Sequence, residues 1–91
     1  VDAEALRDAM CYQIKIDGYY KRHGFTKDRM VRVDLNAQTI LLNGISVPDE
    51  KIPQYTKIID QYGLKRGRGQ YIYFDSEGDD IELGTDTKFS S

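Results

Sequence analysis

The pattern of hydrophobic and polar positions predicts a helix at the start of the chain. Leu6, Met10 and Ile14 recur every four residues and therefore share one face of a helix. Asp2 stands where its carboxylate can cap the first turn. We expect the helix to run toward His23, although the alternation of apolar and polar residues around Ile14 also fits a strand.

Alternation predicts a three-stranded meander in the middle of the chain. Residues 30–35 alternate between apolar and polar, and residues 39–42 and 45–47 are rich in types that favour strands. Asn43-Gly44 lies between the last two segments, and this dipeptide readily adopts the positive φ angles of a type I′ hairpin turn. The three segments are therefore expected to pair as consecutive antiparallel strands.

A second amphipathic helix and a hairpin follow the meander. The helix is expected to begin at Pro53, a residue favoured in a first helical turn, and to end at Gly63. Its apolar stripe consists of Ile52, Tyr55, Ile58, Ile59 and Tyr62. Residues 70–74 and 80–83 are the two predicted strands of the hairpin. Because the first of them is apolar on both faces, we expect it to be covered on both.

This order of elements predicts an α+β fold. An antiparallel sheet, made of the three-stranded meander plus the C-terminal hairpin, carries two helices packed on one face. With 91 residues the chain has room for a single small domain and one core, and residues 84–91 are expected to form a frayed polar tail.

Composition limits the expected classes of partner and the expected cellular location of the domain. The chain has 13 basic and 15 acidic residues and a net charge of −2, whereas a protein that binds polyanions over its whole surface carries a basic excess. Cys11 is the only cysteine, and no Asn-x-Ser/Thr site is present, so a reducing, cytoplasmic location is expected. No apolar run approaches the ~20 residues that span a bilayer, and we expect no membrane partner.

Two basic clusters with nearby tyrosines are the candidate binding residues. One cluster is a loop in which Gly67 and Gly69 give the backbone freedom, and the other surrounds the end of the first helix. Arginine and lysine can contact phosphate, and tyrosine can stack on bases or anchor a protein interface. The candidates are Lys65, Arg66, Arg68, Tyr71, Tyr73, Tyr19, Tyr20, Lys21, Arg22, Arg29 and Arg32.

The sequence does not match the residue spacing of the catalytic and metal-binding motifs considered below. The acidic run at residues 75–80 has carboxylates that suit Ca²⁺, but its glycine is at the fourth position, and a calcium loop requires it at the sixth. Cys11 and His23 are 12 positions apart, or ~18 Å along a helix axis, too far to act as a nucleophile and its base. We therefore expect no catalytic residue, no metal site and no cofactor, and a protein that is not an enzyme.

These observations favour a small protein-interaction module with an assembly or regulatory role, binding a protein partner or a second copy of itself. The aromatic-rich sheet and the near balance of charge are its basis. A nucleic-acid-binding module is the alternative. It would use the basic residues of segments 21–32 and 65–68, with tyrosines stacking on unpaired bases. It requires both clusters to share one face, which the sequence does not decide.

Overall fold

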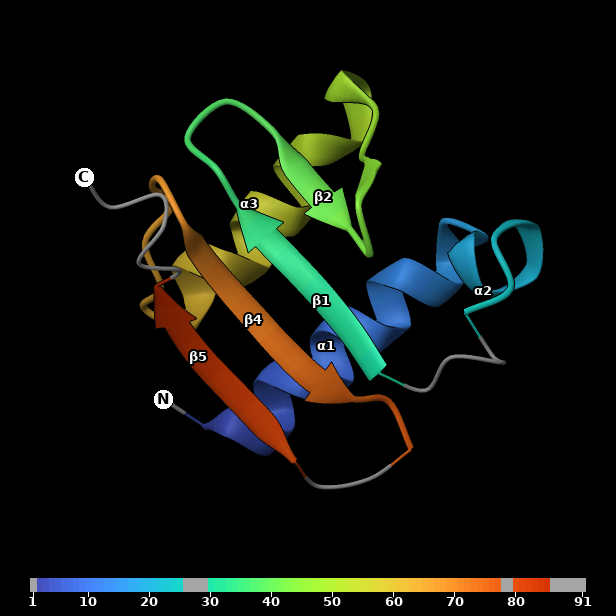
Figure 1. Cartoon of the computed structure of the whole chain (residues 1–91), viewed down its shortest axis with the longest axis horizontal. Coiled ribbons are helices and arrows are strands. Elements are labelled where there is room, and N and C mark those ends of the chain that lie inside the picture. The colour runs from blue at the N-terminus through green and yellow to red at the C-terminus, as the bar shows by residue number, and fades with distance from the viewer. Residues whose placement is uncertain (1, 26–29, 78–79, 86–91) are drawn as a thin grey trace.

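The computed structural model describes residues 2–25, 30–77 and 80–85 (Figure 1). The helices are α1 (Ala3–Ile16), α2 (Tyr19–Arg22), the 3-10 turn η1 (Asp49–Lys51) and α3 (Ile52–Gln61). The strands are β1 (Met30–Leu35), β2 (Ile40–Leu42), β3 (Ile45–Ser46), β4 (Gln70–Asp75) and β5 (Ile81–Thr85).

One antiparallel sheet carries all five strands in the order β3-β2-β1-β4-β5. The hairpin of β4 and β5 therefore joins the meander by pairing β4 with β1. The longer helices α1 and α3 both lie behind the sheet in Figure 1. The predicted α+β fold, with helices on one face of an antiparallel sheet, is confirmed, and the structure adds the short helix α2.

The core lies between the sheet and the helices. In β1, Val31, Val33 and Leu35 point toward the helices, and the residues between them point away. Their partners across the strands, Ile72 and Phe74, are also fully buried. From the helices, the core receives the fully buried Leu6, Met10, Ile14, Tyr55 and Ile59.

Local signals in the sequence determine several turns. Asn43 and Gly44 have φ angles of 49° and 82°, which confirms the type I′ turn between β2 and β3. The side chain of Asn43 adds a bond of 2.8 Å from the backbone N–H of Arg32. Gly63 has a φ of 72° just after α3, and the N–H of Leu64 donates to the carbonyl of Ile59, so the predicted glycine C-terminus is also confirmed.

The expected N-terminal helix is two helices rather than one. Asp2 caps α1, accepting a bond of 3.1 Å from the N–H of Ala5. The helical path breaks at Gly18, whose φ is 82°, and α2 then continues until His23 caps its end. The sequence thus predicted the helical type of this segment, and the turn at Gly18 redirects its second part.

The expectation that residues 70–74 are covered on both faces is wrong. Tyr73 is 38% exposed, because both long helices pack on the opposite face of the sheet (Figure 1). The last strand is also longer than predicted, since β5 includes Gly84 and Thr85.

A buried carboxylate joins the end of α1 to α3. The side chain of Asp17 is only 5% exposed and accepts a bond of 2.6 Å from the hydroxyl of Tyr55. The Nε2 of Gln13 donates to the same carboxylate at 3.1 Å, and the Nζ of Lys51 lies 3.8 Å from it. Burial, and then the bond to Asp17, raise the pKa of Tyr55 above its ordinary value, so its hydroxyl keeps its proton and donates.

We expect Tyr55→Phe to lower the free energy of unfolding by about 1.5–3 kcal/mol, because a buried carboxylate loses a donor. Urea unfolding followed by circular dichroism measures the change. Tyr12→Phe is the matched control, since Tyr12 is 66% exposed, and it should change stability by less than about 0.5 kcal/mol. Equal effects of the two substitutions would contradict a special role for the Tyr55 hydroxyl.

Candidate functional site

The face of the sheet turned away from α1 and α3 is an ordered surface that could contact a partner. Cross-strand pairing places its side chains in rows, because residues directly opposite each other point to the same side. We call this surface the open face. It consists of Arg32, Asp34, Leu41, Tyr71, Tyr73, Glu82 and Gly84.

Arg32, Asp34 and Tyr71 form a fixed cluster in the middle of the open face. The guanidinium of Arg32 lies 4.3 Å from the ring centroid of Tyr71, a cation–π arrangement. Its Nε donates to the Oδ1 of Asp34 at 2.9 Å. The stacked guanidinium and its carboxylate hold each other in place, so this part of the surface is preorganised.

Tyr71 reaches across the neighbouring strand because its partner there is a glycine. A Cβ atom built on Gly84 would lie 2.9 Å from the Tyr71 hydroxyl oxygen, closer than real side chains allow. The ring therefore covers the backbone of β5, and its hydroxyl lies above that strand. Aromatic residues that pack over a cross-strand glycine stabilise a sheet in this way.

The charges on the open face do not form a basic surface. Among the described residues of this face, Arg32 is the one cation, and Asp34 and Glu82 contribute two carboxylates. The exposed ring of Tyr73 stands between Arg32 and Glu82 in the same cross-strand row. The face is thus aromatic, with a slight excess of negative charge.

The basic loop before β4 is partly used to hold the structure together. The Nε of Arg66 donates to the carbonyl of Asn36 at 2.8 Å, and the N–H of Gly67 donates to the carbonyl of Leu35 at 2.8 Å. The Nη2 of Arg66 is buried and has no hydrogen-bond partner among the described residues. Lys65 and Arg68 remain exposed.

The second basic cluster is also partly engaged. Tyr19 is only 3% exposed and packs in the core, while Arg22 lies 5.5 Å from its ring centroid and donates to the backbone carbonyl of Asp17. Lys21 is exposed, and Tyr20 is half-buried. The predicted contact Arg29 lies outside the described residues.

Among the described residues, the two basic clusters lie apart. In Figure 1, α2 lies at one end of the sheet and the connection from α3 to β4 at the other. Arg32 lies between them on the open face, stacked on Tyr71. Among the predicted binding residues that the structure describes, Arg32, Tyr71 and Tyr73 are brought together on the open face, and Tyr19 and Arg22 meet at α2. The pairing of β4 with β1 makes the cluster on the open face, and the sequence contains no local signal for it.

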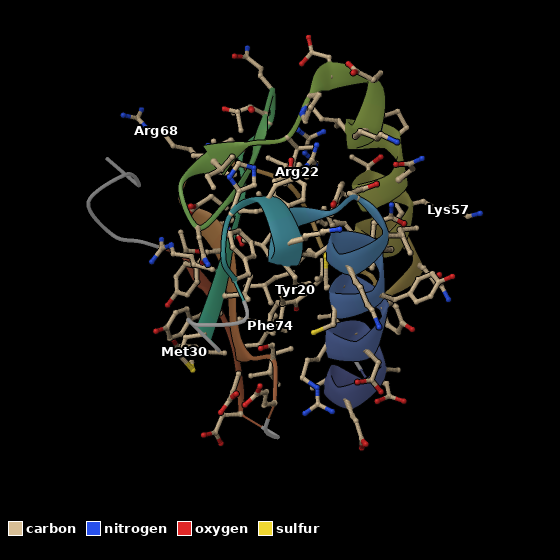
Figure 2. The ribbon with its side chains drawn as sticks, turned by 90° about the vertical axis from the view of Figure 1, so that its right-hand side faces the viewer. Tyr20, Arg22, Met30, Lys57, Arg68 and Phe74 are labelled. Atoms are coloured by element: carbon tan, nitrogen blue, oxygen red, sulfur yellow. The ribbon has the colours of Figure 1, made fainter. Side chains whose placement is uncertain are left out.

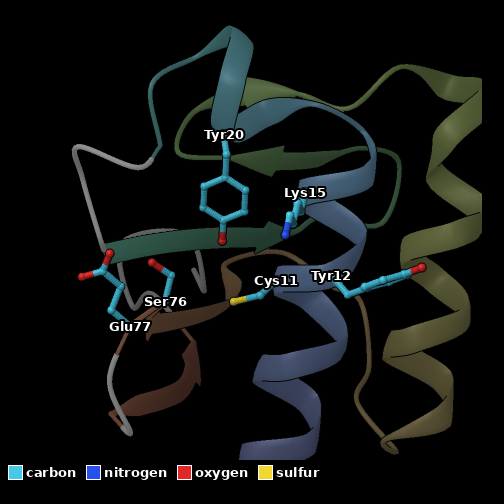
Figure 3. A pocket seen from close by; sticks show the side chains of 6 residues that line it. All are labelled: Cys11, Tyr12, Lys15, Tyr20, Ser76 and Glu77. Atoms are coloured by element: carbon cyan, nitrogen blue, oxygen red, sulfur yellow. The ribbon is translucent and has the colours of Figure 1, made fainter.

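A cavity of about 330 Å³ lies on the helical side, between α1, α2 and the turn after β4. Figure 3 shows the thiol of Cys11, the hydroxyl of Tyr20 and the side chain of Ser76 converging on it. Burial raises the pKa of the Cys11 thiol above its ordinary 9.0, and the hydrogen bond with Tyr20 partly offsets that rise. Burial is also the main reason why the pKa of Tyr20 is raised, followed by its bond to Cys11. Both groups are therefore protonated at neutral pH.

No protein-family model, curated protein or solved structure matches the chain.

Within residues 2–25, 30–77 and 80–85, no group of three His, Cys, Asp or Glu side chains is placed to hold a metal ion. The acidic turn lies partly outside these ranges, since residues 78–79 are not described. Among the described helices, none is both long and apolar enough to cross a membrane.

We expect Cys11 to react slowly with iodoacetamide at neutral pH, because burial suppresses its thiolate. The labelling rate, followed by mass spectrometry between about pH 7 and about pH 10.5, should rise with a midpoint above 9.0. In Tyr20→Phe the midpoint should move higher, since the Tyr20 hydrogen bond lowers the thiol pKa. Tyr12→Phe alters the same cavity wall and should leave the midpoint in place. A wild-type midpoint at or below 9.0 would contradict this account.

Proposed function

We propose that the chain is a non-enzymatic protein-binding module and that a partner protein contacts its open face. The observation that carries this proposal is the arrangement of Arg32, Tyr71 and Tyr73 on a sheet face turned away from α1 and α3 (Figure 1). Tyrosine and arginine are the residue types that most often anchor protein interfaces. Tyrosine presents a large, rigid contact area, and Arg32 is already held by Tyr71 and Asp34, so ordering these side chains costs little on binding.

The charges of the open face favour a protein over a nucleic acid. A polyanion needs several cations at phosphate spacing, whereas this face has one arginine, already paired with Asp34. Of the other predicted binding cations that the structure describes, those of α2 and those of the connection before β4 lie at separate ends of the sheet, and Arg66 and Arg22 are bonded to backbone carbonyls. A protein partner would complement this face with a basic side chain opposite Glu82 and an apolar side chain against the ring of Tyr73.

The proposal is tested with the immobilised chain and a lysate of the organism that encodes it. Proteins retained by the wild type are identified by mass spectrometry, purified, and measured again with Tyr73→Ser. We expect this substitution to weaken binding about 30-fold, the effect of an interface tyrosine worth about 2 kcal/mol. Because Tyr73 is 38% exposed, the fold should persist, which circular dichroism verifies.

Lys57→Ser provides the matched control for a change of surface. Lys57 extends from α3 on the helical side of the molecule, away from the sheet (Figure 2). Binding should be unchanged in this variant. Partners retained equally by Tyr73→Ser and the wild type would show that the open face is not the contact. Retention that disappears after nuclease treatment would instead support the nucleic-acid alternative.

A further inference from the structure

Strand β5 ends the sheet and presents backbone groups at its outer edge. The N–H of Asp75 donates to the carbonyl of Asp80, so these two residues form a hydrogen-bonded pair. In an antiparallel ladder such pairs alternate, and the register then turns the backbone groups of Glu82 and Gly84 toward β4. The N–H and C=O groups of Ile81, Leu83 and Thr85 consequently face outward, where a further strand can pair with them.

The outward groups of β5 are complementary to those of a second β5. With Leu83 opposite its own copy on a two-fold axis, Ile81 stands opposite Thr85 of the other chain. The pair of Leu83 with its copy and the two symmetric pairs of Ile81 with Thr85 are then all of the hydrogen-bonded type. The pairing extends over the whole of β5, Ile81–Thr85. We infer that two copies of this chain associate through antiparallel β5–β5 pairing centred on Leu83. The sheet would then continue through the axis as a single sheet of twice as many strands.

The side chains on both faces fit this register. On the helical side, Leu83 is 41% exposed in one chain, and its copy would cover it across the axis. On the open face, Glu82 would stand opposite Gly84 of the second chain, where the absence of a side chain leaves room. The hydroxyl of Tyr71 lies above that glycine and can donate to the arriving carboxylate. Arg32 stacks on the same tyrosine and adds positive charge to this corner.

Neighbouring registers fit less well. Moving the axis to Glu82 would place two carboxylates directly opposite each other, which is destabilising. In that register Leu83 would stand opposite Ile81 of the second chain, still on the helical side, so the carboxylate pair is what disfavours it. A foreign strand could use the same edge, but only a second β5 supplies the glycine, the carboxylate and the leucine in the order that these three positions require.

The association does not require a partner on the open face, and it should be reversible. Pairing five residues per chain buries a small area, which is typical of weak, transient complexes. We expect sedimentation equilibrium of the full chain, from about 1 µM to about 1 mM, to show a shift from the 10.5 kDa of one chain to twice that mass. A mass that stays at one chain throughout would overturn the inference.

Substitution at Leu83 tests the location of the contact. Leu83→Lys places two like charges on the axis, and because Leu83 is already 41% exposed the single chain should still fold. We expect its dissociation constant to rise at least tenfold. Ile16→Lys is the matched control, since Ile16 is exposed on α1. Tyr73→Ser is a second control, because it changes the open face and leaves the backbone edge of β5 unchanged. Both should dimerise as the wild type does. A dimer unaffected by Leu83→Lys would mean that a different surface is used.

Disulfide trapping tests the register. In a Cys11→Ser background, Leu83→Cys places its thiols in a hydrogen-bonded pair, where Cα atoms about 5.5 Å apart can be bridged. Glu82→Cys is offset from its copy by two residues, so its Cα atoms are more than about 7 Å apart and should link poorly. Under mild oxidation, Leu83→Cys should form covalent dimer at least tenfold faster than Glu82→Cys. Equal rates, or faster linking by Glu82→Cys, would refute this register.

Discussion

The hydrogen bond from Tyr55 to Asp17 is the contact on which the layered arrangement of this protein depends. Apolar packing alone tolerates small sliding of one helix along another, whereas a buried carboxylate must meet its donors at one position. Tyr55 and Gln13 supply those donors at the end of α1, and Arg22 bonds to the backbone carbonyl of the same aspartate. One residue thereby sets the positions of α1, α2 and α3 relative to each other, and the helical layer covers the sheet as a unit.

Because that layer covers one face, the side chains on the other face must find partners beside them. Arg32 pairs with Asp34 and stacks on Tyr71, and Tyr71 packs over Gly84. These lateral contacts link β1, β4 and β5 through side chains as well as through the backbone. Their effect is a surface whose aromatic and charged groups are ordered before any partner arrives, so that less conformational entropy is lost on contact.

The sequence predicted the features that depend on neighbouring residues. Asp2 capped its helix, Asn43-Gly44 formed its turn, and Gly63 ended α3, because each of these acts within a few residues of itself. The α+β class followed from the order of elements. What the sequence could not predict is contact between distant segments. The pairing of β4 with β1 places Tyr73 on the open face beside Arg32, and the hydrogen bond to the carbonyl of Asn36 turns Arg66 inward. No local pattern encodes either contact, and the candidate site depends on both.

The glycine in the last strand links positions that are far apart in the sequence. Any side chain at position 84 would occupy the space of the Tyr71 ring, and displacing that ring would remove the support beneath the Arg32 guanidinium. The residue at position 84 in β5 therefore restricts which side chains can occupy position 71 in β4 and position 32 in β1. In a lineage of such chains, a larger residue at position 84 would be tolerated only together with a smaller one at position 71. The three positions would then change together rather than one at a time.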